Sequence, residues 1–152
     1  MDRREIGAWL EGPGAVLHRD DTRYAGERLG LPEDGPGSIA RTGRRLAGVA
    51  LDWAASLLVA SLAASYGSPE HSVLVLAVFA VETYVGMLLG GASFGHRVVG
   101  LRVVHLGGGP IGPLRALLRV ALLVLVIPAV VYDRDGRGLH DRLAGTAVLR
   151  AR

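Results

Sequence analysis

Three charged residues lie inside strongly apolar stretches of this 152-residue chain: Asp52, Glu82 and Arg119. A carboxylate at the centre of a membrane helix costs about 3 kcal/mol, so such a residue usually has a partner, a proton or an aqueous cavity. A neutral cluster of Asp52, Arg119 and a protonated Glu82 satisfies this requirement. The residue types predict either a polar clamp that fixes helix packing or a site that carries a cation or a proton, and they leave both open.

The apolar stretches themselves cover residues 46–65, 73–91 and 116–132. A helix needs about 20 mostly apolar residues to cross a bilayer, and the first two stretches meet that length. The third is shorter and is interrupted by Pro128, so it either spans or re-enters. The pattern predicts an all-α membrane protein, a small multi-pass helical bundle with two transmembrane helices and this third helix, preceded by an irregular cytoplasmic tail.

The composition removes most catalytic chemistry. The chain has no Cys and no Lys, which excludes thiolate nucleophiles, Cys-based metal sites and a Schiff-base lysine. Its five His residues lack a ligand spacing such as HExxH, and no GxSxG nucleophile motif occurs. The sequence therefore predicts a protein that is not an enzyme and that binds neither a metal ion nor a cofactor.

The net charge of +3 is divided unevenly along the chain. Residues 1–40 hold five Arg and eight acidic residues, a net of −3, and residues 41–152 hold twelve Arg and six acidic residues, a net of +6. The Arg residues border the apolar stretches and are not interleaved with aromatic side chains, as base stacking would need. We therefore expect the lipid bilayer, and not nucleic acid, as the partner of the basic half.

The positions of the Arg residues predict an orientation. Arg41 and Arg44 precede the first span together with Arg45, whereas residues 66–72 contain no Arg. The positive-inside rule then places the N-terminus in the cytoplasm and residues 66–72 outside the cell membrane. An Arg-rich C-terminal segment would break this rule if residues 116–132 spanned the bilayer, and would obey it if they re-entered. The side of the C-terminus stays open.

Spacing along the helices gives further expectations. Arg45 and Asp52 are seven residues apart, about 20° short of two turns, so they share a helix face about 10 Å apart. We expect Arg45 to reach the lipid headgroups. Gly86 and Gly90 form a GxxxG motif, which predicts close helix packing within the bundle or in a homo-oligomer. Residues 94–114 include a β-branched run before three glycines, typical of a short hairpin or an interfacial segment.

Four separated motifs together resemble the RDD family of bacterial membrane proteins: RRLAGVALDW, SFGHRVVGLRVV, LRALLR and RGLHDRLAGTAVL. The family is named for one Arg and two Asp, which correspond here to Arg45, Asp52 and Asp141. The resemblance covers residues 39–150 as an RDD-type transmembrane domain, after a tail of residues 1–38 with a short helix and a flexible linker. His96 departs from the family, which often has Lys or Arg there.

The resemblance implies a membrane protein whose molecular function is largely unassigned. Transport of a small ligand has been suggested for the family, and cation/proton exchange has been attributed to some relatives. Asp52 and Glu82 permit such a role, with Arg45 and Asp141 pairing across the domain if the C-terminus is cytoplasmic. The alternative is a non-transporting scaffold or regulatory protein that binds a protein partner through its acidic N-terminal tail.

Overall fold

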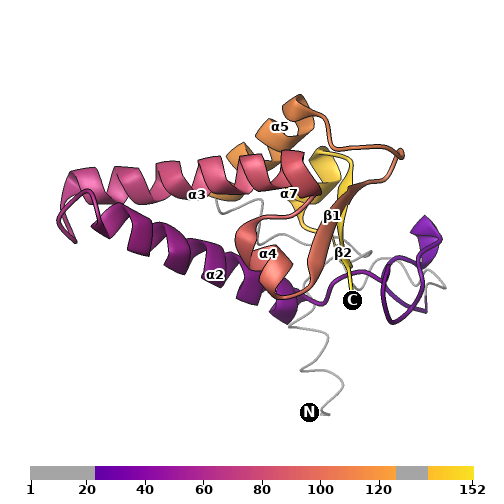
Figure 1. Cartoon of the computed structure of the whole chain (residues 1–152). Coiled ribbons are helices and arrows are strands. Elements are labelled where there is room, and N and C mark those ends of the chain that lie inside the picture. Colours follow the sequence, from indigo (N-terminus) through magenta and orange to yellow (C-terminus); the bar gives the residue numbers. More distant parts are fainter. Residues whose placement is uncertain (1–22, 126–136) are drawn as a thin grey trace, which may run out of the picture.

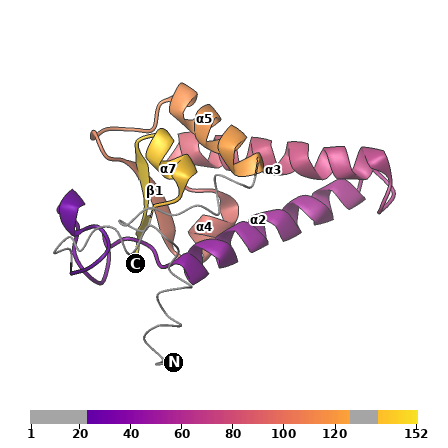
Figure 2. The same ribbon diagram turned by 180° about the vertical axis from the view of Figure 1, so that it is seen from behind.

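Two long antiparallel helices form a hairpin that projects from the rest of the molecule (Figures 1 and 2). They are α2 (Thr42–Ser61) and α3 (Pro69–Gly90) in a computed structural model that describes residues 23–125 and 137–152 of the chain. Ser68 caps α3 by accepting a hydrogen bond from the amide of His71, and Pro69 occupies the first turn, where its missing N–H costs nothing. Gly91 ends α3 in the left-handed conformation that favours glycine.

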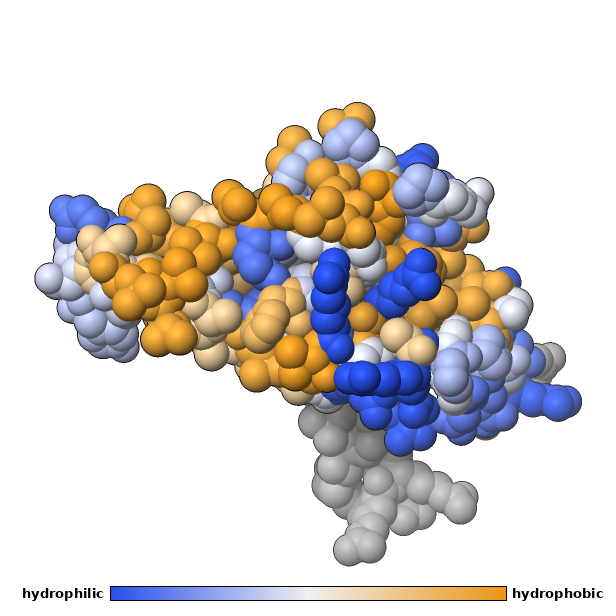
Figure 3. Space-filling model, in the orientation of Figure 1, coloured by the Kyte–Doolittle hydropathy of each residue, from blue (hydrophilic) through white to orange (hydrophobic). Residues whose placement is uncertain are grey.

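Polar residues lie on the inner faces of the hairpin and apolar residues on its outer faces, the reverse of a helix pair in a water-soluble protein. A buried stripe at helical spacing follows each helix, and these stripes contain polar residues: Arg45, Asp52 and Ser56 on α2, and His71 and Thr83 on α3. The outward faces are apolar, with Leu58, Leu62 and Leu89 between 69% and 83% exposed. Figure 3 shows apolar side chains over much of the hairpin. Such a surface suits hydrocarbon better than water.

Among the described helices, α3 alone is long and apolar enough to cross a bilayer. It matches the second predicted span, at 73–91. The first predicted span, 46–65, corresponds to α2, which begins and ends four residues earlier and so takes Arg44 and Arg45 into its first turn. Of the third apolar stretch, residues 116–124 form the end of helix α5 (Pro113–Val124), and most of the rest, with Pro128, lies outside the described residues.

The described chain is mostly helical, with five α-helices, but the all-α prediction was wrong in one respect. Strands β1 (Leu101–His105) and β2 (Thr146–Arg150) form a two-stranded antiparallel sheet, with Val103 opposite Val148. The β-branched run after α3 therefore does not form the predicted local hairpin. It pairs with the C-terminal end of the chain, because both segments bury apolar side chains in one core, formed by residues that include Ala40, Met87, Leu101, Val103, Ile111, Ala116, Val120 and Val148.

Two short helices connect this sheet to the hairpin. Helix α4 (Phe94–Val98) follows α3 and packs against α2, and α7 (Leu139–Leu143) precedes β2 and packs against α5. The sheet, α4 and α7 gather at the end of the hairpin where α2 begins and α3 ends (Figure 1). The C-terminal strand therefore lies at the same end of the hairpin as Arg41 and Arg44.

The described part of the predicted tail is irregular apart from a 3-10 turn, η1 (Glu27–Leu29). Its last residues pair with β2: the amide of Gly37 donates to the carbonyl of Arg150 at 2.8 Å, and the amide of Ala40 donates to the carbonyl of Val148 at 2.9 Å. Residues 37–40 thus belong structurally to the sheet and not to a free linker. The predicted short helix near the N-terminus lies outside the described residues.

Candidate functional site

The two carboxylates in the hairpin converge on the first turn of α4. Asp52, on α2, accepts a hydrogen bond through Oδ1 from the amide of Gly95, and Glu82, on α3, accepts one through Oε1 from the amide of Phe94. Ser93 is the N-cap of α4 and accepts through Oγ from the amide of His96 at 3.4 Å. The first amides of a helix lack partners within the helix, and a carboxylate placed there also interacts favourably with the positive end of the helix dipole. Asp52 and Glu82 therefore hold α4 between α2 and α3.

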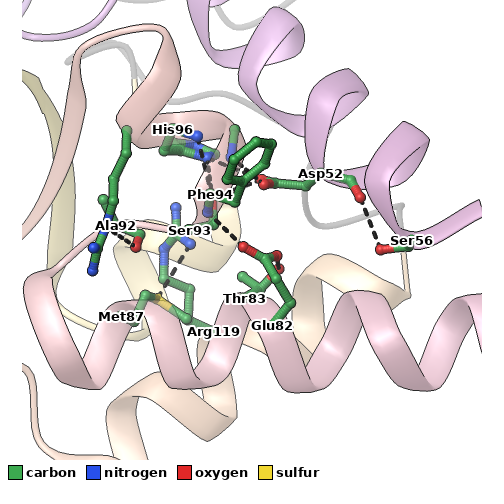
Figure 4. A network of polar contacts seen from close by, with 12 residues as sticks. Asp52, Ser56, Glu82, Thr83, Met87, Ala92, Ser93, Phe94, His96 and Arg119 are labelled. Carbon is green, nitrogen blue, oxygen red and sulfur yellow. Dashed lines mark hydrogen bonds and ion pairs between the residues drawn. The ribbon is translucent and has the colours of Figure 1, made fainter. Parts of the chain in front are cut away.

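Asp52 also begins a buried chain of polar contacts (Figure 4). The hydroxyl of Ser93 donates to Oδ2 of Asp52 at 2.6 Å and lies 2.7 Å from Nδ1 of His96. The same His96 nitrogen lies 3.4 Å from Oδ2 of Asp52. All three side chains are buried, so carboxylate, hydroxyl and imidazole form one connected group away from water.

This group resembles a Ser–His–Asp triad only in composition. In a triad, the serine and the carboxylate contact opposite nitrogens of the imidazole, so that the carboxylate orients the base. Here the hydroxyl and the carboxylate both face Nδ1 of His96, and Ser93 itself is 2% exposed. The arrangement can pass a proton between its members, but it does not present an oriented nucleophile to a substrate.

Glycines allow α4 to approach the hairpin this closely. A Cβ on Gly95 would overlap the carbonyl oxygen of Gly48 and the carboxylate of Asp52. A Cβ on Gly86 would lie 2.7 Å from the carbonyl oxygen of Ala92. Gly86 therefore packs against the turn that leads into α4, and Gly90 faces the side chain of Arg97, so within the described chain this GxxxG motif accommodates the α3–α4 connection instead of a second long helix.

The second polar cluster surrounds Asp141 on α7. Arg119 donates through Nε to Oδ1 of Asp141 at 2.7 Å, and Arg45 donates through Nη1 to Oδ2 at 3.3 Å. His140 and Thr146 also contact this carboxylate, at 3.5 and 3.3 Å. Asp141 is fully buried, and burial opposes its ionisation, but Arg119, His140 and Arg45 together outweigh burial and lower the pKa of Asp141.

This geometry corrects two expectations. Arg119 does not join Asp52 and Glu82 in one neutral cluster: it pairs with Asp141, so the predicted group is divided between two sites. Arg45 does not reach the headgroups: its side chain is 5% exposed and binds Asp141 and the carbonyl of Val148. Sequence spacing does not reveal which partner a long guanidinium side chain will reach.

Four contributors to these sites were not among the predicted site residues: Ser93, His96, His140 and Thr146. The spacing of Ser93 and His96 is that of an N-cap and the third residue of a helix, so a capping search would have found Ser93. Adjacent residues diverge on a helix, but the imidazole ring of His140 still lies 3.5 Å from the carboxylate of its neighbour Asp141. Across the two described ranges, no three His, Asp or Glu side chains are grouped so as to hold a metal ion.

A cavity of about 440 Å³ lies between α2, α3, α5 and α7 and connects the two clusters. His96 lines it from the first cluster, and Arg45, Arg119, His140 and Asp141 line it from the second. The remaining wall is largely apolar and includes Val49, Trp53, Leu76, Phe79, Leu123 and Val124. A separate open groove beside α3 and α4 includes Glu82 and Arg97 in its lining. Glu82 therefore lines the groove, whereas Asp52 lines neither opening and is linked to the cavity through His96.

The similarity of this chain to known proteins is found at the level of a family. No curated protein and no solved structure matches the chain. A family model described as RDD family matches residues 39–145, which include both clusters and the two helices of the hairpin. The residues that carried the resemblance, Arg45, Asp52 and Asp141, are all buried and hydrogen-bonded in the two sites. Because that match covers more than half of its length, the chain belongs to the RDD family.

Proposed function

We propose that this chain is a multi-pass protein of the cell membrane that exchanges protons for a small cation through the Asp52 cluster. The observation that carries the proposal is the buried contact chain from Asp52 through Ser93 to His96, with heavy-atom distances of 2.6 and 2.7 Å. Carboxylates and imidazoles both bind and release protons in water, and a hydroxyl between them can relay a proton from one to the other.

The two openings give this relay an entrance and an exit. His96 lines the cavity between α2, α3 and α5, and Glu82 lines the open groove beside α4. Glu82 and Asp52 bind consecutive amides, those of Phe94 and Gly95. Only the first turn of α4 therefore lies between the carboxylate of Asp52 and the groove that Glu82 lines. Ionisable residues at membrane depth commonly mark ion or proton pathways, which supports this assignment.

The topology that we propose follows the positions of the Arg residues. The basic start of α2 and the C-terminal strand lie at one end of the hairpin, where Arg45 contacts both Asp141 and the carbonyl of Val148. The positive-inside rule assigns that end to the cytoplasm. This arrangement favours a cytoplasmic C-terminus. In this topology α2 crosses the bilayer beside α3 although Arg44, Arg45 and Asp52 lower its hydropathy, because Arg45 and Asp52 are buried within the protein.

The experiment is ion-driven proton flux in proteoliposomes that contain an entrapped pH-sensitive dye. Asp52→Asn keeps an oxygen that accepts from the amide of Gly95 and places an NH2 group beside the hydroxyl of Ser93, but the side-chain amide cannot carry a proton. We expect the variant to insert normally and to lose at least tenfold in flux under a Na⁺ or K⁺ gradient. Ser56→Ala is the matched control on the same helix face, because Ser56 contacts the backbone oxygen of Asp52 and not its carboxylate. Unchanged flux in Asp52→Asn would contradict the proposal.

The alternative function is a membrane scaffold that transports nothing and binds a protein partner. It is favoured by the fact that Asp52 and Glu82 already serve as caps for α4, which gives both carboxylates a structural purpose. Its test is removal of residues 1–22, which spares the part of the tail that pairs with β2. A scaffold would lose its partner in a pull-down from membranes, whereas an exchanger would keep its flux.

A further inference from the structure

We propose that the cavity between α2, α3, α5 and α7 binds a single-chain amphiphile with an anionic headgroup, a carboxylate or a phosphate, and an alkyl tail. This goes beyond proton exchange and does not depend on it. A volume of about 440 Å³ lies within the range of small-molecule sites, which are mostly apolar with a few placed polar groups. The lining of this cavity has that character, and its polar and apolar parts are separated.

The polar end is formed by two guanidinium groups. Arg45 and Arg119 both line the cavity and are 5% and 2% exposed, and they share the single carboxylate of Asp141. Two guanidinium groups at one end of a cavity offer hydrogen-bond donors and positive charge to an incoming anion. The planar fork of an arginine matches a carboxylate or a phosphate in two-point hydrogen bonding, which makes it the usual residue for such headgroups.

Arg119 has hydrogen-bonding capacity to spare. A guanidinium carries five N–H donors. Within the described residues, Arg119 donates from Nε to Asp141 and from Nη1 to Sδ of Met87 at 3.5 Å, and sulfur is a weak acceptor. A buried cation that lines a cavity with most of its donors unused is a prepared site for an acceptor oxygen.

The apolar end lies deeper along the same helices. On α2, Arg45 is followed one and two turns later by Val49 and Trp53, and on α5, Arg119 is followed by Leu123 and Val124. The ring of Trp53 packs edge-on against Phe79 of α3, with centroids 5.5 Å apart. From Arg45 to Trp53 the helix rises about 12 Å. A bound amphiphile would therefore point its headgroup toward the basic end of the hairpin and its tail toward the bilayer centre.

Trp53 provides a direct probe, because the chain has only one other tryptophan, Trp9. The protein, with Trp9→Phe, would be placed in phosphatidylcholine nanodiscs and titrated with brominated decanoate, whose bromine quenches a tryptophan on contact. Brominated decanol and a brominated decyl-trimethylammonium would be the neutral and cationic comparisons. We expect saturable quenching by the acid with an affinity at least tenfold higher than for either comparison. Equal, unsaturable quenching by all three would mean bulk lipid only and would overturn the proposal.

Two variants locate the site. Val49→Phe fills the cavity from α2 and is expected to weaken binding of the acid at least tenfold. Leu58→Phe is the matched control, because Leu58 lies on the same helix, is 69% exposed and does not line the cavity. Unchanged binding in Val49→Phe, with the same melting temperature as the parent, would also overturn the proposal.

The source of the headgroup is settled by competition. Adding lysophosphatidylglycerol, an anionic lipid with a single acyl chain, to the nanodiscs displaces brominated decanoate if the natural occupant is an anionic lipid of the bilayer. No displacement, with binding of the acid intact, assigns the site to a free carboxylic acid or phosphate amphiphile. Both outcomes require the anion-selective cavity, and they differ only in where its ligand comes from.

Discussion

Two buried aspartates illustrate two ways of keeping a carboxylate out of water. Asp141 lies between Arg45 and Arg119, whose guanidinium groups stay charged, and His140 contacts it more distantly at 3.5 Å. Asp52 instead accepts from a backbone amide and a hydroxyl and lies beside a histidine. The first environment holds its carboxylate through ion pairs with arginine, whereas the second holds it through hydrogen bonds. This difference favours a structural role for Asp141, and the proposed proton exchange places the mobile proton at Asp52.

The largest expected effect is therefore at Asp141. Asp141→Ala leaves two buried guanidinium groups without their shared carboxylate, and breaking a buried ion pair from one side costs about 3–5 kcal/mol. We expect a loss of that size in the free energy of unfolding, measured by denaturant titration in detergent. The control is Asp34→Ala, which removes an exposed ion pair with Arg41 and should change stability by less than about 1 kcal/mol. Similar losses of stability in the two variants would show that the buried ion pairs of Asp141 contribute no more than the exposed pair of Asp34 and Arg41.

The next effect concerns the close approach that brings Asp52 to α4. Gly95→Ala places a Cβ against the carbonyl oxygen of Gly48, a backbone atom that cannot move aside, and overpacking of this kind costs about 1–3 kcal/mol. Gly90→Ala is the matched substitution, because its Cβ meets only the far end of Arg97. We expect thermal unfolding to separate the two variants. A destabilised Gly90→Ala would show instead that the Arg97 contact is rigid.

Removing the hydroxyl of Ser93, the middle member of the proposed proton relay, should lower stability less than Gly95→Ala does. Ser93→Ala loses the N-cap of α4 and the contact with Asp52, and loss of a serine cap costs about 0.5–2 kcal/mol. Ser72→Ala removes an exposed serine that bonds only the carbonyl of Ser68 and should be close to neutral. The same pair distinguishes function from stability, since proton flux should fall in Ser93→Ala alone.

The pH dependence of stability gives a further test of the ion-paired environment of Asp141. The pKa of Asp141 is lowered in the folded protein, mainly because Arg119, His140 and Arg45 outweigh burial. Its contribution is therefore fully present above the ordinary pKa of an aspartate, about 4, and is lost as pH falls from there through the lowered folded value. We expect the melting temperature of the protein to fall in this acidic window, and that of Asp141→Asn to fall less. Parallel curves would show that other carboxylates determine acid unfolding.

The sequence predicted local features of this molecule better than its long-range pairings. The apolar runs located α2 and α3 to within a few residues, and the seven-residue spacing correctly placed Arg45 and Asp52 on one buried face. The sheet was missed because β1 and β2 are five-residue strands more than 40 residues apart, and neither specifies the other locally. The assignment of Arg119 failed for a related reason: its partner, Asp141, belongs to a short helix outside the apolar runs.

The smallest predicted effect is the decisive one for the comparison. Asp52→Asn keeps an acceptor for the amide of Gly95, and it exchanges a charged hydrogen bond for a neutral one, a difference of about 1 kcal/mol. We expect a change in the free energy of unfolding no larger than that, together with loss of proton flux. A loss as large as that of Asp141→Ala would mean that the fold requires the negative charge of Asp52. In that case both aspartates would be structural, and the exchange of protons would have to be sought at Glu82.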